Sequence, residues 1–507
     1  MAATRSGGDR ASGPPVPPVA ASLRGRAATG VAWTTVDAVG SRLITTVVFV
    51  ALARLLDPAS FGLVALALVF ISLMRLLVDQ GFGSAIVQRS ELSKGHLDTA
   101  FWVTLASGAA LAGLLCALAG PIATVTGSRG LAPVLQALSL VIVVGAPSSI
   151  AVAVLRRDLA FHRLAVRKLV AALCGGVAGI VGALAGLGVW SLVLQALVLA
   201  AVSTVLLWTV TSYRPSFHFS RGYFGELFGF SSKVIGITTV NFLSRRSDDL
   251  LVGSVLGAVS LGLYSVAYRL LTIMTETLST TIDLVAYPTF SKLQDDRQRL
   301  RRAYASAVRT SAAVAAPAFL GAALLAPELI EVLFGDKWAA SIPVMRVLAL
   351  AGLAHSLISA GTPLLLAVGR PQDALKVNAT IAAANVVGFA IAVQFGILAV
   401  AAVFTIRAYL LAPLSIWSVK RVLGFTWWEW LRPVLPAVGS ALAMALVLAA
   451  GRTVVLPELG PLGWLLVATP SGALLYLAAM RVLAPHQLRE FRADVASVVL
   501  RRRAKSA

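Results

Sequence analysis

The chain has 507 residues, of which 58% are hydrophobic and only 13% are charged, and its mean hydropathy is +0.86. Soluble globular proteins carry about 25% charged residues, so this composition excludes a cytosolic enzyme, a nucleic-acid binder and a secreted disulfide scaffold. It predicts an all-α, polytopic membrane protein. The net charge of +21 is then explained by Lys and Arg at the cytoplasmic rims of a helical bundle, and no nucleic-acid partner is expected.

In chain order, the first segment is residues 1–27, whose Gly, Pro and Arg content predicts a disordered basic cytoplasmic tail. A membrane-spanning helix needs about 20 mostly apolar residues, and the chain contains fourteen such runs. They lie at about 30–53, 59–78, 98–122, 131–155, 167–186, 188–210, 227–245, 250–285, 304–326, 341–367, 373–394, 397–418, 433–451 and 461–482. The eighth run is too long for one span, so its helix is expected to begin near Leu261, after a short connection around Gly257.

Lys and Arg are distributed very unevenly between alternate loops. One set of loops, which includes both termini, holds 30 of these residues, and the other set holds four. Positive charge gathers in cytoplasmic loops, so both termini are expected in the cytoplasm and the number of spans is expected to be even. The two cysteines, Cys116 and Cys174, lie in apolar runs and predict neither a disulfide framework nor a metal cluster.

The chain also resembles itself at an offset of 200 residues. Residues 53–74 align with residues 253–274 without a gap, and six of the aligned positions are identical. Because this offset covers six helices, two parallel, pseudo-symmetric six-helix lobes are expected. We predict an N-terminal lobe at 28–212, a C-terminal lobe at 213–424, two additional helices at 425–484 and a basic cytoplasmic tail at 485–507.

The eighth predicted helix carries polar residues along one face. They recur at spacings of three and four residues, which places them on one side of an α-helix. These residues are Ser265, Arg269, Thr272, Glu276, Thr280, Asp283 and Tyr287. An ionisable side chain inside a membrane helix costs about 2.5–3.5 kcal/mol on insertion scales, so this stripe is expected to face water or a polar partner.

Other polar residues within the spans are concentrated in a few helices. The first helix has Thr34, Asp37, Ser41, Arg42 and Thr45, the seventh has Asn241, Arg245, Arg246, Asp248 and Asp249, and single basic residues are Arg75, Arg346, His355 and Arg407. We interpret this pattern as a water-filled, net cationic cavity where the two lobes meet. The alternative is internal salt bridges, such as Arg269 with Glu276, or Arg245 and Arg246 with Asp248 and Asp249. Arg75 could also extend to the membrane interface.

A cationic cavity would suit an anionic ligand. The planar guanidinium group fits phosphate, and the chain has 35 Arg and 8 Lys. The candidate substrate-binding residues are Arg42, Arg75, Asn241, Arg245, Arg246, Arg269, Arg346 and Arg407. Asp37, Glu276 and Asp283 are candidates for coupling transport to a proton or sodium gradient, and no cofactor is expected.

Two groups of short motifs mark the beginnings of the predicted lobes. The first group is Gly30-Val-Ala-Trp33, Arg54-Leu-Leu-Asp-Pro-Ala-Ser-Phe-Gly62-Leu and Asp79-Gln-Gly81-Phe-Gly83-Ser-Ala-Ile86-Val-Gln88-Arg. The second group is Asp248-Asp-Leu-Leu-Val-Gly253, Leu256-Gly257, Leu261-Gly-Leu-Tyr264-Ser-Val-Ala267-Tyr and Tyr287-Pro288-Thr-Phe. From about residue 25 to residue 480, the chain resembles the Wzx-type oligosaccharide flippases, the polysaccharide transporters of the multidrug/oligosaccharidyl-lipid/polysaccharide exporter superfamily.

This resemblance implies a two-lobed transporter in the bacterial inner membrane that exports undecaprenyl-diphosphate-linked saccharide units by alternating access. The polymer could be an exopolysaccharide, an O-antigen or a cell-wall polysaccharide. The resemblance also implies that Arg42, Arg75 and Arg269 hold the diphosphate, that the lipid tail stays among membrane lipids, and that a polysaccharide polymerase and chain-length proteins are partners.

Four other functions stay open at this point. A multidrug or cation antiporter of the same superfamily usually has an acidic pocket, whereas arginine is in surplus here. A flippase for a peptidoglycan lipid precursor would carry similar chemistry. A membrane enzyme such as a polymerase or ligase would need a large extracytoplasmic loop, and the longest such loop here has about a dozen residues. A non-transporting scaffold for polysaccharide assembly would not need the polar stripe.

Overall fold

The computed structural model describes residues 18–79, 82–83, 86, 92–487 and 489, and every regular element in this part is a helix. The helices of the first half are α1 (Pro18–Leu55), α2 (Pro58–Asp79), α4 (Lys94–Val125), α5 (Leu131–Gly145), α6 (Ser148–Arg157), α7 (Phe161–Leu184) and α8 (Val189–Val210). Those of the second half are α9 (Arg221–Leu251), η1 (Val252–Leu256), α10 (Gly257–Lys292), α11 (Arg297–Leu324), α12 (Ala326–Phe334), η2 (Asp336–Ser341), α13 (Ile342–Ile358), α14 (Gly361–Ala367), α15 (Pro371–Ala392), η3 (Val393–Phe395), α16 (Ile397–Leu423), α17 (Trp427–Leu431) and α18 (Leu435–Leu483).

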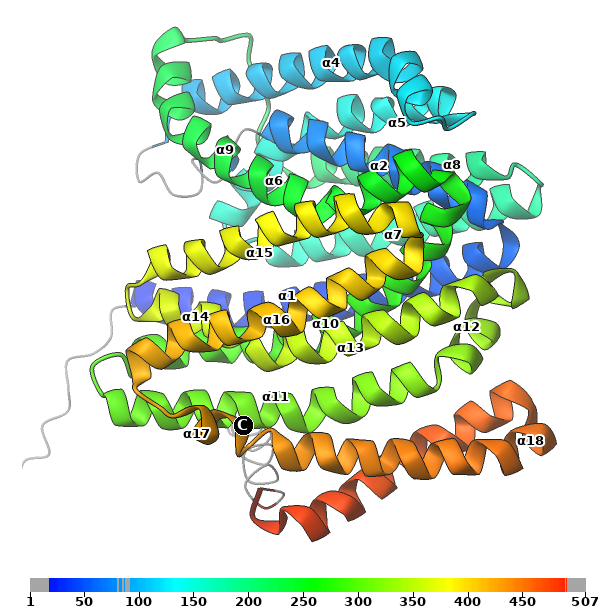
Figure 1. Cartoon of the computed structure of the whole chain (residues 1–507). Coiled ribbons are helices and arrows are strands. Elements are labelled where there is room, and N and C mark those ends of the chain that lie inside the picture. Colours follow the sequence, from blue (N-terminus) through cyan, green and yellow to red (C-terminus); the bar gives the residue numbers. More distant parts are fainter. Residues whose placement is uncertain (1–17, 80–81, 84–85, 87–91, 488, 490–507) are drawn as a thin grey trace, which may run out of the picture.

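The long helices lie side by side in one bundle, and both ends of the described chain lie at the same end of it (Figure 1). An even number of crossings brings the ends of a chain to one side in this way. The first helix, α1, begins at Pro18, inside the predicted tail of residues 1–27. Residues 1–17 of that tail, and most of the predicted C-terminal tail at 485–507, lie outside the described part.

By length and composition, the described residues contain 12 helices able to span a membrane, or 13 if the bent pair of α5 and α6 counts as one span. The prediction of an all-helical, polytopic membrane protein is confirmed, whereas the predicted number of fourteen spans is not. The observed and predicted numbers of spans differ at Phe242–Thr277. This stretch counts as one span by length and composition, but it includes parts of both α9 and α10.

The chain reverses direction between these two helices at Gly257. The φ angle of Gly257 is +82°, which glycine adopts without steric cost. The hydroxyl of Tyr264 donates a hydrogen bond of 3.0 Å to Oδ2 of Asp248, although residues so far apart in sequence would lie about 24 Å apart in a continuous helix. α9 and α10 therefore form a helical hairpin whose arms meet near the turn, and α10 begins slightly before the predicted start at Leu261.

Two further apolar runs contain breaks. The run at 131–155 is divided into α5 and α6, which are bent by 41° relative to each other, because Pro147 lacks the backbone N–H that a continuous helix needs there. In α18, Gly460 has a non-helical φ of +66°, and near this residue the helix divides into two stretches long enough to span a membrane, Leu435–Val455 and Glu458–Leu483. The last two predicted spans are therefore the two arms of α18.

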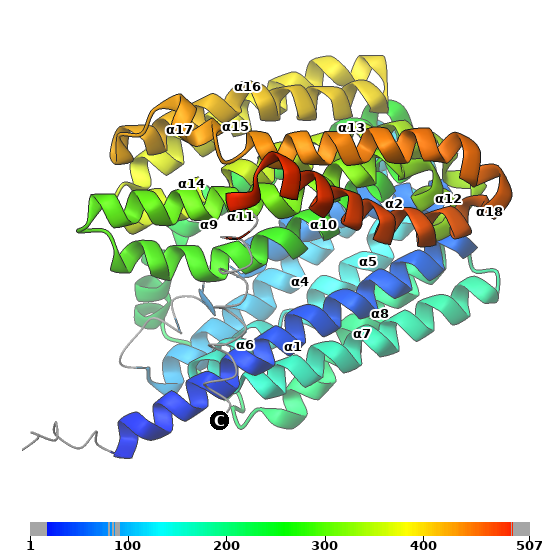
Figure 2. The same cartoon turned by 90° about the horizontal axis from the view of Figure 1, so that it is seen from below.

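The helices pack as two groups, with α18 at the side. In the first group, α1–α8, called the N-lobe below, α7 packs against α1 and α8, and α5 packs against α4 and α8. In the second group, α9–α16, called the C-lobe below, α13 packs against α11 and α16, and α15 packs against α16. α18 packs against α11 (Figure 2). This grouping follows the predicted division, whose residue boundaries stay predictions.

The two lobes come into direct backbone contact where α2 crosses α10. A Cβ atom added to Gly62 would lie 1.6 Å from the carbonyl oxygen of Ala258, and one added to Gly262 would lie 1.9 Å from the carbonyl oxygen of Pro58. The contact is reciprocal at the 200-residue offset, as a two-fold relation between the helices would produce. Glycine permits this approach because small residues allow membrane helices to pack backbone against backbone.

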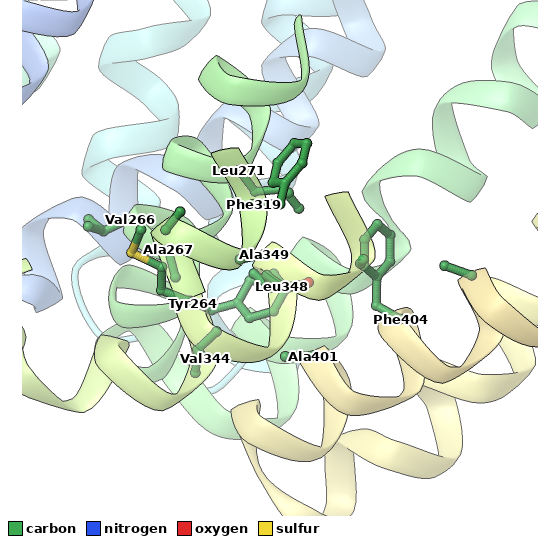
Figure 3. Close-up of a cluster of buried hydrophobic side chains, with 14 of the residues drawn as sticks. Tyr264, Val266, Ala267, Leu271, Phe319, Val344, Leu348, Ala349, Ala401 and Phe404 are labelled. Atoms are coloured by element: carbon green, nitrogen blue, oxygen red, sulfur yellow. The ribbon is translucent and has the colours of Figure 1, made fainter. Parts of the chain in front are cut away.

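The C-lobe has an apolar core between α10, α13 and α16. Tyr264, Leu348 and Ala401 come from these three helices and are fully buried. Figure 3 shows their side chains gathered between the helices, with Phe404 at one side of the group. This packing fixes α10 relative to α16 and therefore positions the polar residues that the two helices carry on their other faces.

The connection between the lobes is anchored to α4. The buried carboxylate of Asp98 accepts hydrogen bonds from the hydroxyl of Tyr213 at 2.8 Å and from the backbone N–H of Ser216 at 3.2 Å, and the Ser216 hydroxyl also donates to it. Burial and the Asp98 carboxylate raise the pKa of Tyr213. The phenol therefore stays protonated throughout the physiological pH range and keeps donating to Asp98.

Candidate functional site

One end of the interface between the lobes is closed by buried contacts, called the seal below. Trp338 of η2 is fully buried, and its indole N–H donates a hydrogen bond of 2.9 Å to the carbonyl oxygen of Ala53 on α1. Its ring packs edge-on against Phe61 of α2, with centroids 5.4 Å apart. The side chain of one lobe therefore fills a site made by two helices of the other.

Charged side chains extend the seal. The guanidinium of Arg54 donates hydrogen bonds to the carbonyl oxygens of Val332 and Leu333, at the C-terminal end of α12, where carbonyl groups lack partners within the helix. In return, Nζ of Lys337 donates a hydrogen bond of 2.7 Å to the carbonyl oxygen of Arg54. These contacts join the corner between α1 and α2 to α12 and η2.

Further along the interface, α1 and α10 meet through polar side chains. Nη2 of Arg42 lies 3.2 Å from Oε2 of Glu276, and Nη1 of Arg42 donates to Oγ1 of Thr277 at 3.5 Å. Neither charged side chain is enclosed, since 29% of the Arg42 side chain and 56% of the Glu276 side chain are exposed. The polar stripe of α10 thus faces a polar residue of α1, and Glu276 forms an ion pair with Arg42.

Arg269 lies on the same side of α10 and is exposed. Its Cζ is 6.0 Å from the centroid of the Phe49 ring on α1, so Arg269 also lies between α1 and α10. Arg42, Arg269, Glu276 and Thr277 are called the interlobe polar region below. Two guanidinium groups and one carboxylate give this region a net positive charge.

The predicted internal salt bridge of α9 forms in part. Nη1 of Arg246 lies 2.7 Å from Oδ2 of Asp249. Asp248 is buried and accepts hydrogen bonds from the backbone N–H of Asp249 at 2.9 Å and from the hydroxyl of Tyr264 at 3.0 Å. Arg245 is exposed and lines a cavity of the C-lobe.

Two adjoining cavities lie inside the C-lobe. The first has a volume of 290 Å³ and is lined by residues of α9, α10, α13, α15 and α16, and the second has a volume of 270 Å³. Both are lined by His355, Ile381 and Arg407. The predicted polar residues that line the first cavity are Arg245, Asp248, Thr272, Glu276, His355 and Arg407. Part of the polar stripe of α10 thus faces the interior of the C-lobe.

A third cavity, of 420 Å³, lies inside the N-lobe and contains Arg75. Its charged and hydroxyl-bearing lining residues are Arg75, Asp79, Ser148, Ser149, Arg156, Arg167 and Ser203. Nη2 of Arg75 lies 3.7 Å from the position of a Cβ atom on Gly145, beside the break between α5 and α6. Arg75 is therefore directed toward the interior of the lobe.

The remaining candidates are separate from these groups. Oδ2 of Asp37 accepts a hydrogen bond of 2.7 Å from Nζ of Lys168 on α7. Arg346 is exposed on α13 and belongs to the wall of none of the three cavities. The side chains of Asn241 and Asp283 lie outside the described part of the structure. Among the described residues, no group of three or more His, Cys, Asp or Glu side chains could hold a metal ion.

Sequence reasoning missed several residues of the cavity walls. Arg156 and Arg167 were not among the predicted site residues, although both line the N-lobe cavity, and the break at Pro147 was the available signal for that cavity. Asn378 and Asn385 line the C-lobe cavities. Both lie on α15, seven residues or about two helical turns apart, so their spacing was the signal that could have placed them on one face.

The sequence profile described as polysaccharide biosynthesis protein matches residues 51–343, which is more than half of the chain. The chain belongs to the polysaccharide biosynthesis protein family. It is 29% identical over 452 residues to the lipopolysaccharide biosynthesis protein WzxC of Escherichia coli, covering 84% of this chain and 89% of that protein. It is 32% identical over 342 residues to the succinoglycan biosynthesis transport protein ExoT of Rhizobium meliloti, covering 67% and 69%.

The fold is shared with solved transporter structures. The lipid II flippase MurJ in an inward closed conformation superposes with a TM-score of 0.74 at 15% identity, covering 88% of this chain and 98% of that one. A multidrug resistance transporter in an inward-facing conformation superposes with a TM-score of 0.60 at 16% identity, covering 75% and 95%. The predicted resemblance to polysaccharide transporters of this superfamily is confirmed, and the chain is a multi-pass membrane protein.

Proposed function

We propose that this family member is a flippase that moves lipid-linked oligosaccharide units across the bacterial inner membrane for polysaccharide biosynthesis. The observation that carries the proposal is the interlobe polar region, where Arg42 and Arg269 lie between α1 and α10 in a bundle that is otherwise strongly apolar. An isolated cation in a membrane helix is costly, and a diphosphate between the lobes would offset that cost. Family membership with WzxC and ExoT supports the same substrate class.

The two lobes are proposed to move by alternating access. In the present conformation the seal closes one end of the interface through Trp338, Arg54 and the crossing at Gly62 and Gly262. The distribution of Lys and Arg supports placing this end outside and both termini in the cytoplasm. The lipid-linked substrate would then enter the site from the cytoplasmic side and leave it on the outer side after the seal opens.

The chemistry required of the protein is binding and release, and no covalent step is proposed. Arg42 and Arg269 would hold the diphosphate by charge-assisted hydrogen bonds, and the lipid tail would stay among membrane lipids. When the Glu276 carboxylate separates from Arg42, it is proposed to bind a proton or a sodium ion and so to couple transport to an ion gradient. Asp37, which pairs with Lys168, is the second candidate for this coupling. A polysaccharide polymerase and chain-length proteins are proposed as downstream partners.

Replacing Arg269 or Arg42 with Ala is expected to reduce polymer export by about 10- to 100-fold, because a hydrogen bond to a charged group contributes about 1.5–3 kcal/mol. The measurement is surface polysaccharide in a deletion strain that carries each variant, with the amount of protein in the membrane determined in parallel. Arg129→Ala is the matched control, since Arg129 is exposed in the loop between α4 and α5. Normal export by both R42A and R269A would contradict the assigned role.

A further inference from the structure

Arg407 occupies an unusual place in the C-lobe. It lies on α16 at the junction of the two C-lobe cavities and lines both of them. Only 7% of this residue is exposed. Arginine keeps its charge in proteins, so a full positive charge is held in the interior of a membrane-embedded lobe.

Among the described residues, Arg407 forms no salt bridge, although Asp248 and Glu276 line the same cavity. The Arg407 guanidinium lies against the Phe404 ring, at 4.9 Å from Cζ to the centroid, and its Nε is buried with no hydrogen-bond partner in the described structure. The nearby carboxylates are engaged elsewhere: Asp248 with Tyr264 and Asp249, and Glu276 with Arg42. A buried cation without a paired anion is strongly unfavourable.

The walls around Arg407 combine hydrogen-bonding groups with aromatic rings. Asn385 lines the first cavity, and its Oδ1 is a buried acceptor without a partner among the described residues. The other polar and aromatic residues that line the two cavities include Tyr268, Thr272, Thr275, Ser359, Thr362, Asn378, Phe389, Phe404 and Ser415. Hydroxyl and amide groups beside apolar rings are suited to a sugar, which has polar edges and apolar C–H faces.

We propose that the two C-lobe cavities form one subsite for a carboxylate-bearing sugar residue of the translocated glycan, with the Arg407 guanidinium binding the carboxylate. The Arg407 guanidinium matches a carboxylate in two-point geometry, and the unpartnered Asn385 oxygen accepts a hydrogen bond from a sugar hydroxyl. The inference rests on the proposed function and names its substrate class, a glycan that contains an acidic sugar.

The diphosphate is a poorer occupant of this subsite than a sugar. It is attached to the lipid chain, which stays in the bilayer, whereas Arg407 lies on α16 in a cavity lined by C-lobe helices, and Arg245 and Glu276 line the same cavity. Volumes of 290 and 270 Å³ also approach the size of small-molecule sites, about 300–1,000 Å³, and exceed what a single small anion needs.

The test is the thermal unfolding of the purified full-length protein in detergent with sodium glucuronate, glucose or sodium chloride at matched ionic strength. Glucuronate at ten times its Kd is expected to raise the unfolding midpoint by about 2 °C, whereas glucose and chloride leave it unchanged. Arg407→Gln is expected to abolish the glucuronate shift, and Arg407→Lys, which keeps the charge but loses the planar fork, is expected to reduce it. Arg421→Gln, on the same helix outside both cavities, is expected to keep the full shift.

Two results would overturn the subsite. One is an equal shift with chloride and glucuronate, which would indicate non-specific anion binding. The other is an undiminished glucuronate shift in R407Q, or in R407K if R407Q does not fold. Because this assay requires no translocation, its failure is separate from a failure of polymer export in the deletion strain, which would count against the proposed function itself.

Discussion

Replacing Gly262 with Ala is expected to reduce polymer export more than tenfold while leaving insertion into the membrane intact. The added Cβ would lie 1.9 Å from the carbonyl oxygen of Pro58, and backbone atoms cannot move aside as a flexible side chain can. Overpacking a close contact costs about 1–3 kcal/mol, and here α2 and α10 must separate. The closed seal would then become unfavourable and the transport cycle would stop at that step.

The matched control is Gly120→Ala, because an added Cβ on Gly120 of α4 meets no atom within 4 Å. Export by each variant is measured as surface polysaccharide in a deletion strain, normalised to the protein present in the membrane. Gly62→Ala is expected to behave like Gly262→Ala, since its added Cβ would meet the Ala258 carbonyl. If G262A and G62A exported as well as G120A, the crossing would have no part in the cycle.

Replacing Trp338 with Ala is expected to open the seal. Trp338 is fully buried, and removing a buried aromatic side chain costs about 3–5 kcal/mol. Its hydrogen bond to the Ala53 carbonyl joins the two lobes, so the cost falls on this closed conformation. A free-energy change of about 5.5 kcal/mol converts a 1:99 ratio of two conformations to 99:1. The expected destabilisation of the closed conformation approaches that value.

The measurement is labelling of a cysteine at position 53 by a membrane-impermeant maleimide in intact cells, with Cys116 and Cys174 replaced by Ser. Ala53 is fully buried below Trp338, so A53C is expected to be protected when Trp338 is present and labelled in W338A. Trp428→Ala, at a residue that is 63% exposed, is the control. Equal labelling of A53C with and without Trp338 would exclude a sealing role for this side chain.

The helical bundle and its two-lobed plan were predictable from sequence because the cost of exposing backbone and charge to lipid produces long apolar runs. Gly62 and Gly262 were already visible as identical residues at the 200-residue offset. Their contact was not predictable, since the crossing point of two helices depends on how the whole lobes pack. The number of spans could not be predicted reliably either. At a helix end such as the reversal at Gly257, the residues are as apolar as those of the adjoining helices, so hydropathy does not mark the boundary.

The candidate site was predictable only in part. The pair of Arg246 and Asp249 is local, three residues apart on one helix, and was among the predicted salt bridges. Arg42 and Glu276 lie in different lobes, farther apart in sequence than the length of one lobe, so their pairing could not be read from spacing. Periodicity identified the polar face of α10 but not what that face meets, which includes a cavity inside the C-lobe as well as α1.

The most direct test of the central claim is translocation by the purified protein alone. The protein is reconstituted in liposomes that contain a fluorescent undecaprenyl-diphosphate-linked saccharide, and a membrane-impermeant quencher is added from outside. If the chain moves this substrate between leaflets, the quenched fraction rises from about half to nearly all of the fluorescence, and R269A restores about half. A quenched fraction that stays at half with the wild-type protein, under an imposed proton or sodium gradient as well as without one, would contradict the account.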